Sequence, residues 1–355
     1  MIRLTWLQFR TQAVTAAAAL AAFAVLLAVT GPHLASLYNT SGLVGCHGGG
    51  CGNLAGSFEA EVQGAGIYSA LYVTGLGIIL LTPAVIGLFW GAPLIARELE
   101  TGTAALAWNQ SVTRTRWLAV KLTIVGLTAM AVAEGLSLMQ AWWAAPLGRA
   151  ASHGAPSGPL TQGRFTQLIF ASHGITPLGY AAFAFALGVT AGSLVRRTIP
   201  AMAATLAIFA ALQIAMPLWI RPNLFPASHT TVPIAFGNST LNLYSAGSPH
   251  AFTSSLAADD GLAGQPEAWI RSSGAADAAG HPVSSAVPSA CVPAAISSGP
   301  GAALANCLSS RGIRIAVVYQ PASRYWPLQW TETGIYLVLS LALAGYCFRR
   351  LRCLS

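Results

Sequence analysis

The chain has 355 residues, of which 54% are hydrophobic and only 8% are charged, whereas soluble domains carry about 25% charged residues. This composition excludes an ordinary soluble protein and indicates an integral membrane protein. The net charge of +8 comes from 17 Arg and one Lys against 10 acidic residues. No Arg-rich block or basic stripe with interleaved aromatic residues occurs, so no nucleic-acid partner is expected.

Six apolar stretches are predicted to cross a membrane as helices, because a bilayer core about 30 Å thick needs roughly 20 apolar residues. We therefore predict an all-α integral membrane protein with six transmembrane helices. A signal peptide is the alternative for the first stretch, but its length and the lack of a clear small-x-small cleavage site favour a retained helix. The stretches lie at residues 13–31, 68–95, 122–145, 168–195, 199–220 and 334–348.

Eleven basic residues fall on one side of the membrane if the six helices alternate in direction. That side is expected to be cytoplasmic, because cytoplasmic flanks carry an excess of Lys and Arg. Both termini are therefore predicted to be cytoplasmic, in a multi-pass protein of the plasma membrane. The eleven residues are Arg3, Arg10, Arg97, Arg114, Arg116, Lys121, Arg196, Arg197, Arg349, Arg350 and Arg352.

Residues 32–67 form a Gly-rich loop on the predicted outer face, and this loop contains Cys46 and Cys51. Disulfides persist on that face, and the intervening glycines let the chain turn sharply enough to close one. Zinc is an alternative because His47 completes a Cys-His-Cys set, although the local sequence supplies no fourth ligand. Free thiols are the third interpretation, and the disulfide is the one we favour.

Residues 96–121 join the second and third predicted helices and concentrate charge in a chain that has little. Glu98 and Glu100 lie beside Arg97, and basic residues return the chain to the membrane at Lys121. We predict a polar ledge that projects from the cytoplasmic face. The alternative is a solvated loop that follows the positive-inside rule. Acidic residues contribute little to that rule, so this alternative leaves the two glutamates unexplained.

No nucleotide-hydrolysing or other catalytic motif is present. The single lysine, Lys121, follows Val120, so the chain cannot form a G-x-x-x-x-G-K-[ST] P-loop. The motifs H-E-x-x-H, G-x-S-x-G and C-x-x-C are also absent. We expect no catalytic residue, no metal site and no cofactor in this chain, which is therefore not predicted to be an enzyme by itself.

Glu134 is the acidic residue that we predict to lie within the bilayer, roughly 20 Å from the inner interface at about 1.5 Å per helical residue. Gln213 reaches a similar depth in the fifth helix by the same count. Ionisable residues inside a membrane are costly and by default indicate function. Glu134 and Gln213 are therefore candidates for a translocation path. The alternative is hydrogen bonding between helices that serves packing alone.

Residues 221–330 form a Ser-, Ala-, Gly- and Pro-rich insertion between helices five and six. Loops this long are usually functional or disordered. The β-branched content of residues 312–321, and more weakly of residues 229–236, predicts strands. Cys291 and Cys307 are the local choice for a second disulfide. We expect a small, partly irregular, β-containing extracellular insertion.

The charged segment follows a pattern of its own, in which an Arg-Glu pair, a Gly-Thr pair, a small turn and a basic return succeed one another. The residues are Arg97, Glu98, Gly102, Thr103, Ser111, Val112, Arg114 and Lys121. This pattern resembles the cytoplasmic segment of type-two ABC exporter permeases, whose signature is R-E-x-x-x-G-T. Residues 179–203 and 213–224 are similar to the fourth and fifth spans of an actinobacterial branch of these permeases. The resemblance hardly reaches the insertion.

The resemblance implies a permease, expected as a homodimer in membrane lipid, that pairs with separate ATP-binding subunits. Those subunits bind ATP and Mg²⁺, so no cofactor belongs to this chain. We divide the chain into residues 1–220 with the coupling segment 96–121, the insertion 221–330, and residues 331–355 with the sixth helix and a cytoplasmic tail. The residues expected to couple to the ATP-binding subunit are Arg97, Glu98, Glu100, Gly102, Thr103, Arg114 and Arg116.

Two functions of different classes follow. The leading hypothesis is the permease of an ATP-driven exporter that moves a hydrophobic or amphipathic compound, such as a drug, peptide or lipid, outward. The alternative is a non-transporting membrane sensor or resistance protein in which residues 221–330 bind a ligand. A membrane enzyme is disfavoured, because acidic residues and histidines do not cluster at one depth.

Overall fold

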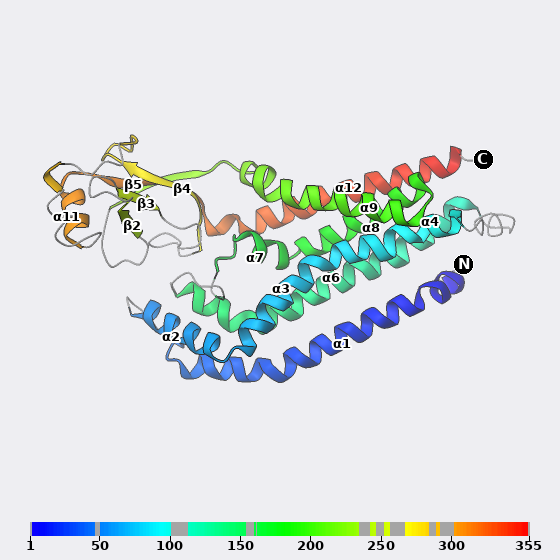
Figure 1. The fold of residues 1–355 in the computed structure, drawn as a ribbon, viewed down its shortest axis with the longest axis horizontal. Helices are drawn as coiled ribbons and strands as arrows, with labels where there is room; N and C mark the ends of the chain where they lie inside the picture. Colours follow the sequence, from blue (N-terminus) through cyan, green and yellow to red (C-terminus); the bar gives the residue numbers. More distant parts are fainter. Residues whose placement is uncertain are drawn as a thin grey trace.

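The computed structural model describes residues 2–46, 50–100, 113–153, 160, 162–233, 242–245, 252–255, 267–283, 289–291 and 302–353. Among these residues, six helical segments are long and apolar enough to cross a membrane, as predicted (Figure 1). They are α1 (Ile2–Thr40), α3 (Ile67–Ile86) continued through η1 (Gly87–Gly91) into α4 (Ala92–Glu100), α6 (Arg114–Ser152), α8 (Thr176–Val195), α9 (Thr198–Ala215) continued through η2 (Met216–Ile220) and η3 (Arg221–Asn223), and α12 (Tyr325–Cys353).

Helix α8 lies at the centre of the bundle. It packs against α3, α4, α6, α9 and α12. In its apolar 18-residue stretch 83% of the residues are buried, whereas only 6% are buried in the corresponding stretch of α1. Its sequence is rich in Ala and Gly, and these small residues let neighbouring helices approach closely. The peripheral helices, by contrast, present large apolar side chains outward, as lipid-facing helices do.

Glycines let the backbone of the second span contact the backbone of α8. A Cβ atom added to Gly188 would lie 2.3 Å from the carbonyl oxygen of Gly87, and one added to Gly192 would lie 2.5 Å from that of Ala92. Gly91 faces the carbonyl oxygen of Phe185 in the same way. Small residues four apart on both helices therefore set this packing, and the π-helical turn η1 lies within it.

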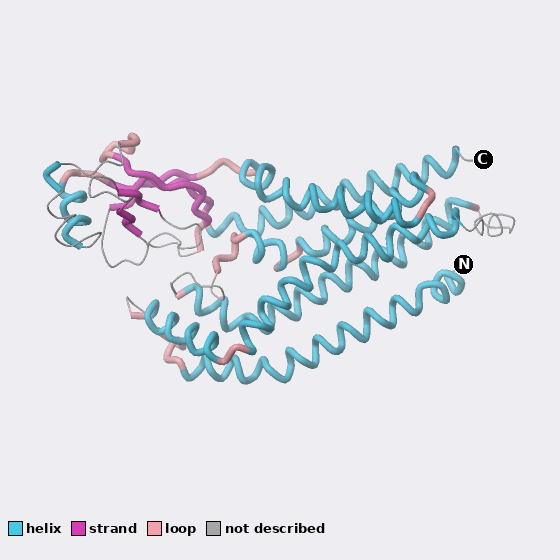
Figure 2. The backbone as a smooth tube through the Cα atoms, in the orientation of Figure 1, coloured by secondary structure: helices cyan, strands magenta, loops and turns pink. Residues whose placement is uncertain are grey.

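The two ends of the bundle differ in what they carry. Both termini lie at one end, together with the end of α4, whereas the strands lie at the other (Figure 1). The tube view separates a helical body from a smaller part that contains the strands (Figure 2). This arrangement is what six alternating crossings produce. Which end faces the cytoplasm stays a prediction.

Several boundaries differ from those predicted from the sequence. Residues 32–67 are largely helical, because α1 runs on to Thr40 and α2 (Cys51–Gly64) buries Phe58 against the bundle. The fourth stretch is broken into α7 (Gln167–Ser172) and α8 at Gly174, whose φ is +70°. The sixth helix begins at Tyr325 rather than at residue 334, because its polar first turns are buried against partners.

The insertion contains a three-stranded antiparallel sheet of order β1-β5-β4, in which β5 is central. Strand β5 confirms the strand predicted at residues 312–321, and β1 confirms the one predicted at residues 229–236 as far as Pro233, where the described residues end. A separate hairpin pairs β2 with β3. The elements are β1 (Ser228–Pro233), β2 (Asn242–Ser245), β3 (Phe252–Ser255), β4 (Trp269–Ala276), η4 (Ser289–Cys291), α11 (Ala302–Ser310), β5 (Arg314–Gln320) and η5 (Ala322–Arg324).

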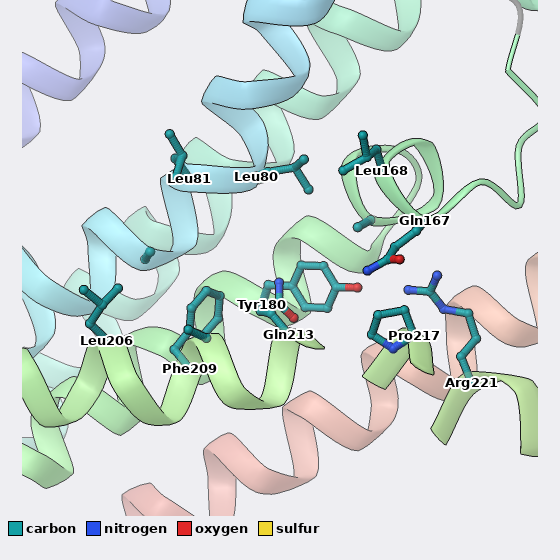
Figure 3. Close-up of a pocket in the computed structure, with 13 residues that line it drawn as sticks. Leu80, Leu81, Gln167, Leu168, Tyr180, Leu206, Phe209, Gln213, Pro217 and Arg221 are labelled. Atoms are coloured by element: carbon teal, nitrogen blue, oxygen red, sulfur yellow. The ribbon is translucent and has the colours of Figure 1, made fainter. Parts of the chain in front are cut away.

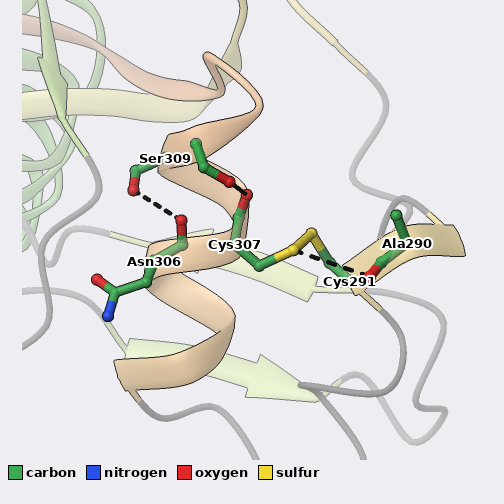
Figure 4. The surroundings of a disulfide bond; sticks show 6 residues. Ala290, Cys291, Asn306, Cys307 and Ser309 are labelled. Atoms are coloured by element: carbon green, nitrogen blue, oxygen red, sulfur yellow. Dashed lines mark hydrogen bonds between the residues drawn. A yellow bond between two sulfur atoms is a disulfide. The ribbon is translucent and has the colours of Figure 1, made fainter.

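Two disulfides join the local cysteine pairs. Cys46 bonds to Cys51 at a Cα–Cα distance of 5.9 Å, and Cys291 bonds to Cys307 at 5.7 Å. The second bond ties η4 to α11 (Figure 4). The first uses both thiols of the alternative zinc site, which therefore loses its sulfur ligands. His47 lies outside the described residues.

Candidate functional site

A buried ion pair lies at the insertion end of the bundle, between η3, which continues α9, and the start of α12. Arg221 donates to both carboxylate oxygens of Glu332, from Nε to Oε2 at 2.8 Å and from a terminal nitrogen to Oε1 at 3.0 Å. The side chains are only 2% and 0% exposed. Tyr180 of α8 also donates its hydroxyl to Glu332, and the guanidinium lies 4.0 Å from the ring centre of Phe170.

This arrangement explains how two charges are tolerated in an apolar bundle. Desolvation of an ion pair is costly and is offset only where the geometry is good and further hydrogen bonds satisfy the charged groups. The bidentate contact is the strong form of an Arg–carboxylate pair. Tyr180 supplies a third hydrogen bond, and the ring of Phe170 covers one face of the guanidinium. The pair thereby links α8, α9 and α12 at one point.

Aromatic packing extends the network along α12, away from the insertion. Tyr180 packs edge-to-face on Tyr336 with ring centres 4.9 Å apart. The hydroxyl of Tyr336 donates to the amide oxygen of Gln213 at 3.0 Å. Gln213 belongs to α9, so a second polar contact joins α9 to α12 in the same region.

Gln329 holds the broken turn between α7 and α8 in place. Its side-chain oxygen accepts from the backbone N–H groups of Ile175 and Thr176 at 3.1 and 3.2 Å, while its nitrogen donates to the carbonyl of Phe170 at 3.1 Å. These groups lack helical partners at the ends of α7 and α8. Gly174 makes the contact feasible, because a Cβ there would lie 2.7 Å from the Gln329 oxygen.

A pocket of about 260 Å³ lies beside the ion pair, between α3, α7, α8 and α9, and we call it the lateral pocket. In Figure 3 the side chains of Tyr180, Gln167 and Arg221 converge at one end, and Leu81 and Leu206 lie at the other. Leu81 and Leu206 are 64% and 44% exposed, so the pocket opens on the apolar flank of the bundle. The lining residues are Leu80, Leu81, Ala84, Gln167, Leu168, Ala171, Tyr180, Leu206, Phe209, Ala210, Gln213, Pro217 and Arg221.

At the end that carries the termini, both predicted coupling glutamates have partners within the chain. Glu98 forms an ion pair with Lys121 of α6, and the Lys121 nitrogen lies 4.5 Å from the ring centre of Trp117. Glu100 accepts from the backbone N–H and the hydroxyl of Thr198 at 3.2 and 2.8 Å, which caps the first turn of α9. These contacts explain the presence of Glu98 and Glu100, which the alternative of a solvated loop left unexplained.

Comparison with known protein families identifies the helical part of the chain. The family described as ABC-2 membrane transporter related matches residues 17–221, which is more than half of the chain. The chain belongs to this ABC-2 family. It is a multi-pass membrane permease of an ABC transporter, a class that works with an ATP-binding partner subunit. Searches of curated proteins and of solved structures found no match.

The remaining predicted coupling residues of this ABC-2 permease are placed as follows. Arg97 and Arg116 are exposed. The backbone of Arg114 begins α6, whose N-cap Thr113 accepts from the N–H of Arg116. Gly102 and Thr103 lie outside the described residues.

The two residues predicted to share a polar layer have different surroundings in the ABC-2 permease. Gln213 lines the lateral pocket and accepts from Tyr336. Glu134 is not among the lining residues of that pocket, and its Oε2 is buried with no hydrogen-bond partner among the described residues. The structure therefore places Gln213, but not Glu134, at the lateral pocket.

Sequence reasoning missed the centre of the site, namely Arg221, Glu332 and Tyr180. It assigned Arg221 and Glu332 to positions outside the apolar spans. A signal was nevertheless present, since polar residues recur at helical spacing from ahead of the last apolar stretch into its first half. These residues are Tyr325, Gln329, Glu332, Thr333, Tyr336 and Ser340, which lie along one side of a helix.

Proposed function

We propose that this permease is the membrane-spanning subunit of an ATP-driven exporter that moves a hydrophobic or amphipathic compound outward. Family membership supports the permease role. The observation that carries the substrate class is the lateral pocket, which has a polar end at Arg221 and an apolar end at Leu206. Ligand sites are mostly apolar with a few placed polar groups, and an opening on an apolar flank suits a molecule that arrives from lipid.

The proposed orientation places the termini and the segment 96–121 in the cytoplasm and the insertion outside. The positive-inside rule supports it, because eleven basic residues flank the spans at the end that carries the termini. The two disulfides support it as well, since Cys46–Cys51 and Cys291–Cys307 belong to the opposite end and disulfides persist in oxidising compartments.

We propose that two ATP-binding subunits, which bind ATP and Mg²⁺, act on a homodimer of the permease through segment 96–121. Arg97 and Arg116 are exposed and suit direct contacts, and Gly102, Thr103 and Arg114 complete the proposed set. In this proposal Glu98 and Glu100 hold the coupling segment in position and do not contact the ATP-binding subunit.

Glu98 joins the end of α4 to α6, and Glu100 joins it to α9. Force applied by an ATP-binding subunit to the segment between α4 and α6 would therefore reach the second, third and fifth spans together. Conformational switching of this kind needs a rigid link between the effector and the moving helices. The two glutamates provide such links, and so they position the coupling segment rather than bind the partner.

The test is co-purification of the permease with an ATP-binding subunit encoded beside its gene, followed by ATP hydrolysis in lipid nanodiscs. A stable complex is expected, and the double change Arg97→Glu/Arg116→Glu should lower its affinity about tenfold or more, because interface charges steer and hold partners. Arg311→Glu, an exposed change in the insertion, is the matched control and should leave the complex intact. Absence of any complex, or equal loss with the control, would contradict the proposal.

A further inference from the structure

The polar end of the lateral pocket presents hydrogen-bond donors. Glu332 lies behind Arg221 and already accepts from Arg221 and Tyr180. The amide oxygen of Gln213 already accepts from Tyr336, which leaves the amide nitrogen toward the pocket. The guanidinium of Arg221 is donor-only, and Gln167 adds a further amide. Among the described residues that line the pocket, none carries a carboxylate.

The apolar end provides room for part of a chain. The volume of about 260 Å³ is below the roughly 300–1,000 Å³ of sites that enclose drug-sized ligands. A head group and the first part of an alkyl chain therefore fit, and the rest of the chain would lie along the exposed Leu81 and Leu206.

We propose that the lateral pocket binds the head of a single-chain anionic amphipath, with a carboxylate held by Arg221, Gln167 and Gln213. The donor-rich end selects an acceptor-rich anion and disfavours a cationic head, which would meet the guanidinium and find no free carboxylate. This inference deepens the proposed function by naming its substrate class, and it rests on that function only for the claim that the bound molecule is transported.

The first experiment measures binding to the purified full chain in nanodiscs at pH 8, without any ATP-binding subunit. The probes are dodecanoate and dodecyltrimethylammonium, which share a chain and differ in the charge of the head. Dodecanoate should bind at least tenfold more tightly. Equal affinities, or a preference for the cation, would overturn the proposal.

Variants then locate the site. Ala210→Trp fills the pocket from α9, whereas Ala211→Trp adds the same bulk at an exposed neighbour that does not line it. Dodecanoate affinity should fall at least tenfold in the first variant and change less than twofold in the second. Equal affinities in the two variants would show that dodecanoate binds elsewhere and would overturn the assignment.

Head-group recognition is tested at Gln167, which is exposed at the start of α7, so its replacement leaves the buried core intact. Gln167→Glu should weaken dodecanoate about tenfold and strengthen dodecyltrimethylammonium, because it replaces a donor with a negative charge. Unchanged selectivity would contradict the proposed role of Gln167. If dodecanoate does not bind but the complete transporter moves other compounds, this inference fails and the exporter function stands. If dodecanoate binds but ATP drives no transport, the exporter function fails.

Discussion

Arg221 is the last residue of the matched family region, and its bidentate partner Glu332 lies 111 residues further along the chain, outside that region. The ion pair joins η3, which continues α9, to α12 at the insertion end of the bundle. The insertion lies between these two segments in the sequence. Because β1 follows η3 along the chain and β5 precedes η5 and α12, the ion pair lies where the insertion joins the bundle.

Loss of one partner of this pair should destabilise the permease strongly. Glu332→Gln leaves the guanidinium buried without its counter-charge, and breaking a buried pair in this way costs about 3–5 kcal/mol. The double change Arg221→Met/Glu332→Gln removes the charge and keeps an acceptor for Tyr180, so it should recover most of the loss. Thermal unfolding of the three proteins in detergent measures the difference. A double variant no more stable than the single one would contradict the account.

The glycine contacts between η1 and α8 predict a site that does not tolerate even alanine. Gly188→Ala places a Cβ 2.3 Å from a backbone oxygen, and backbone cannot move aside as a flexible side chain does. Overpacking of this kind costs about 1–3 kcal/mol. Gly345→Ala is the control, because its Cβ would meet open space. The yield of folded protein should fall only for Gly188→Ala, and equal yields would mean that the two helices can separate at no cost.

The ion pair at the other end predicts a positioning role for Glu98. Glu98→Gln should lower coupling between ATP hydrolysis and transport in the complete transporter. The same change in a Lys121→Met background should add little, because the two side chains act through one contact. A double-mutant cycle on the coupling ratio measures this. Additive effects would indicate that Glu98 contacts the ATP-binding subunit itself.

Hydropathy was sufficient to predict the number of spans, because each span must hold a long apolar run whatever its partners are. It failed at the start of α12, where Gln329 and Glu332 lower the local hydropathy although both are buried. Their burial depends on Arg221 and on the α7–α8 turn, which are distant in the sequence. The concentration of charge near residue 98 was visible in the sequence. The partners of Glu98 and Glu100, namely Lys121 and Thr198, could not be predicted because they lie 23 and 98 residues away.

Topology is predicted to place the insertion outside and the coupling segment inside. In a background with Cys347 and Cys353 replaced, a membrane-impermeant thiol reagent added to intact cells should label Ser272→Cys and miss Arg116→Cys, although both positions are exposed. Permeabilised cells provide the control for reactivity of the second site. Labelling of Arg116→Cys in intact cells would reverse the orientation and remove the proposed contact with the ATP-binding subunit.

ATP-dependent movement of a fluorescent dodecanoate derivative tests whether the permease exports an anionic amphipath through the lateral pocket. The permease and its ATP-binding subunit are reconstituted into liposomes, and transport is compared for the parent protein, Ala210→Trp and Ala211→Trp. We expect ATP-dependent transport by the parent and by Ala211→Trp, with at least a tenfold loss in Ala210→Trp while the complex stays assembled. Equal transport by both tryptophan variants, or no ATP-dependent movement by the parent, would contradict this expectation.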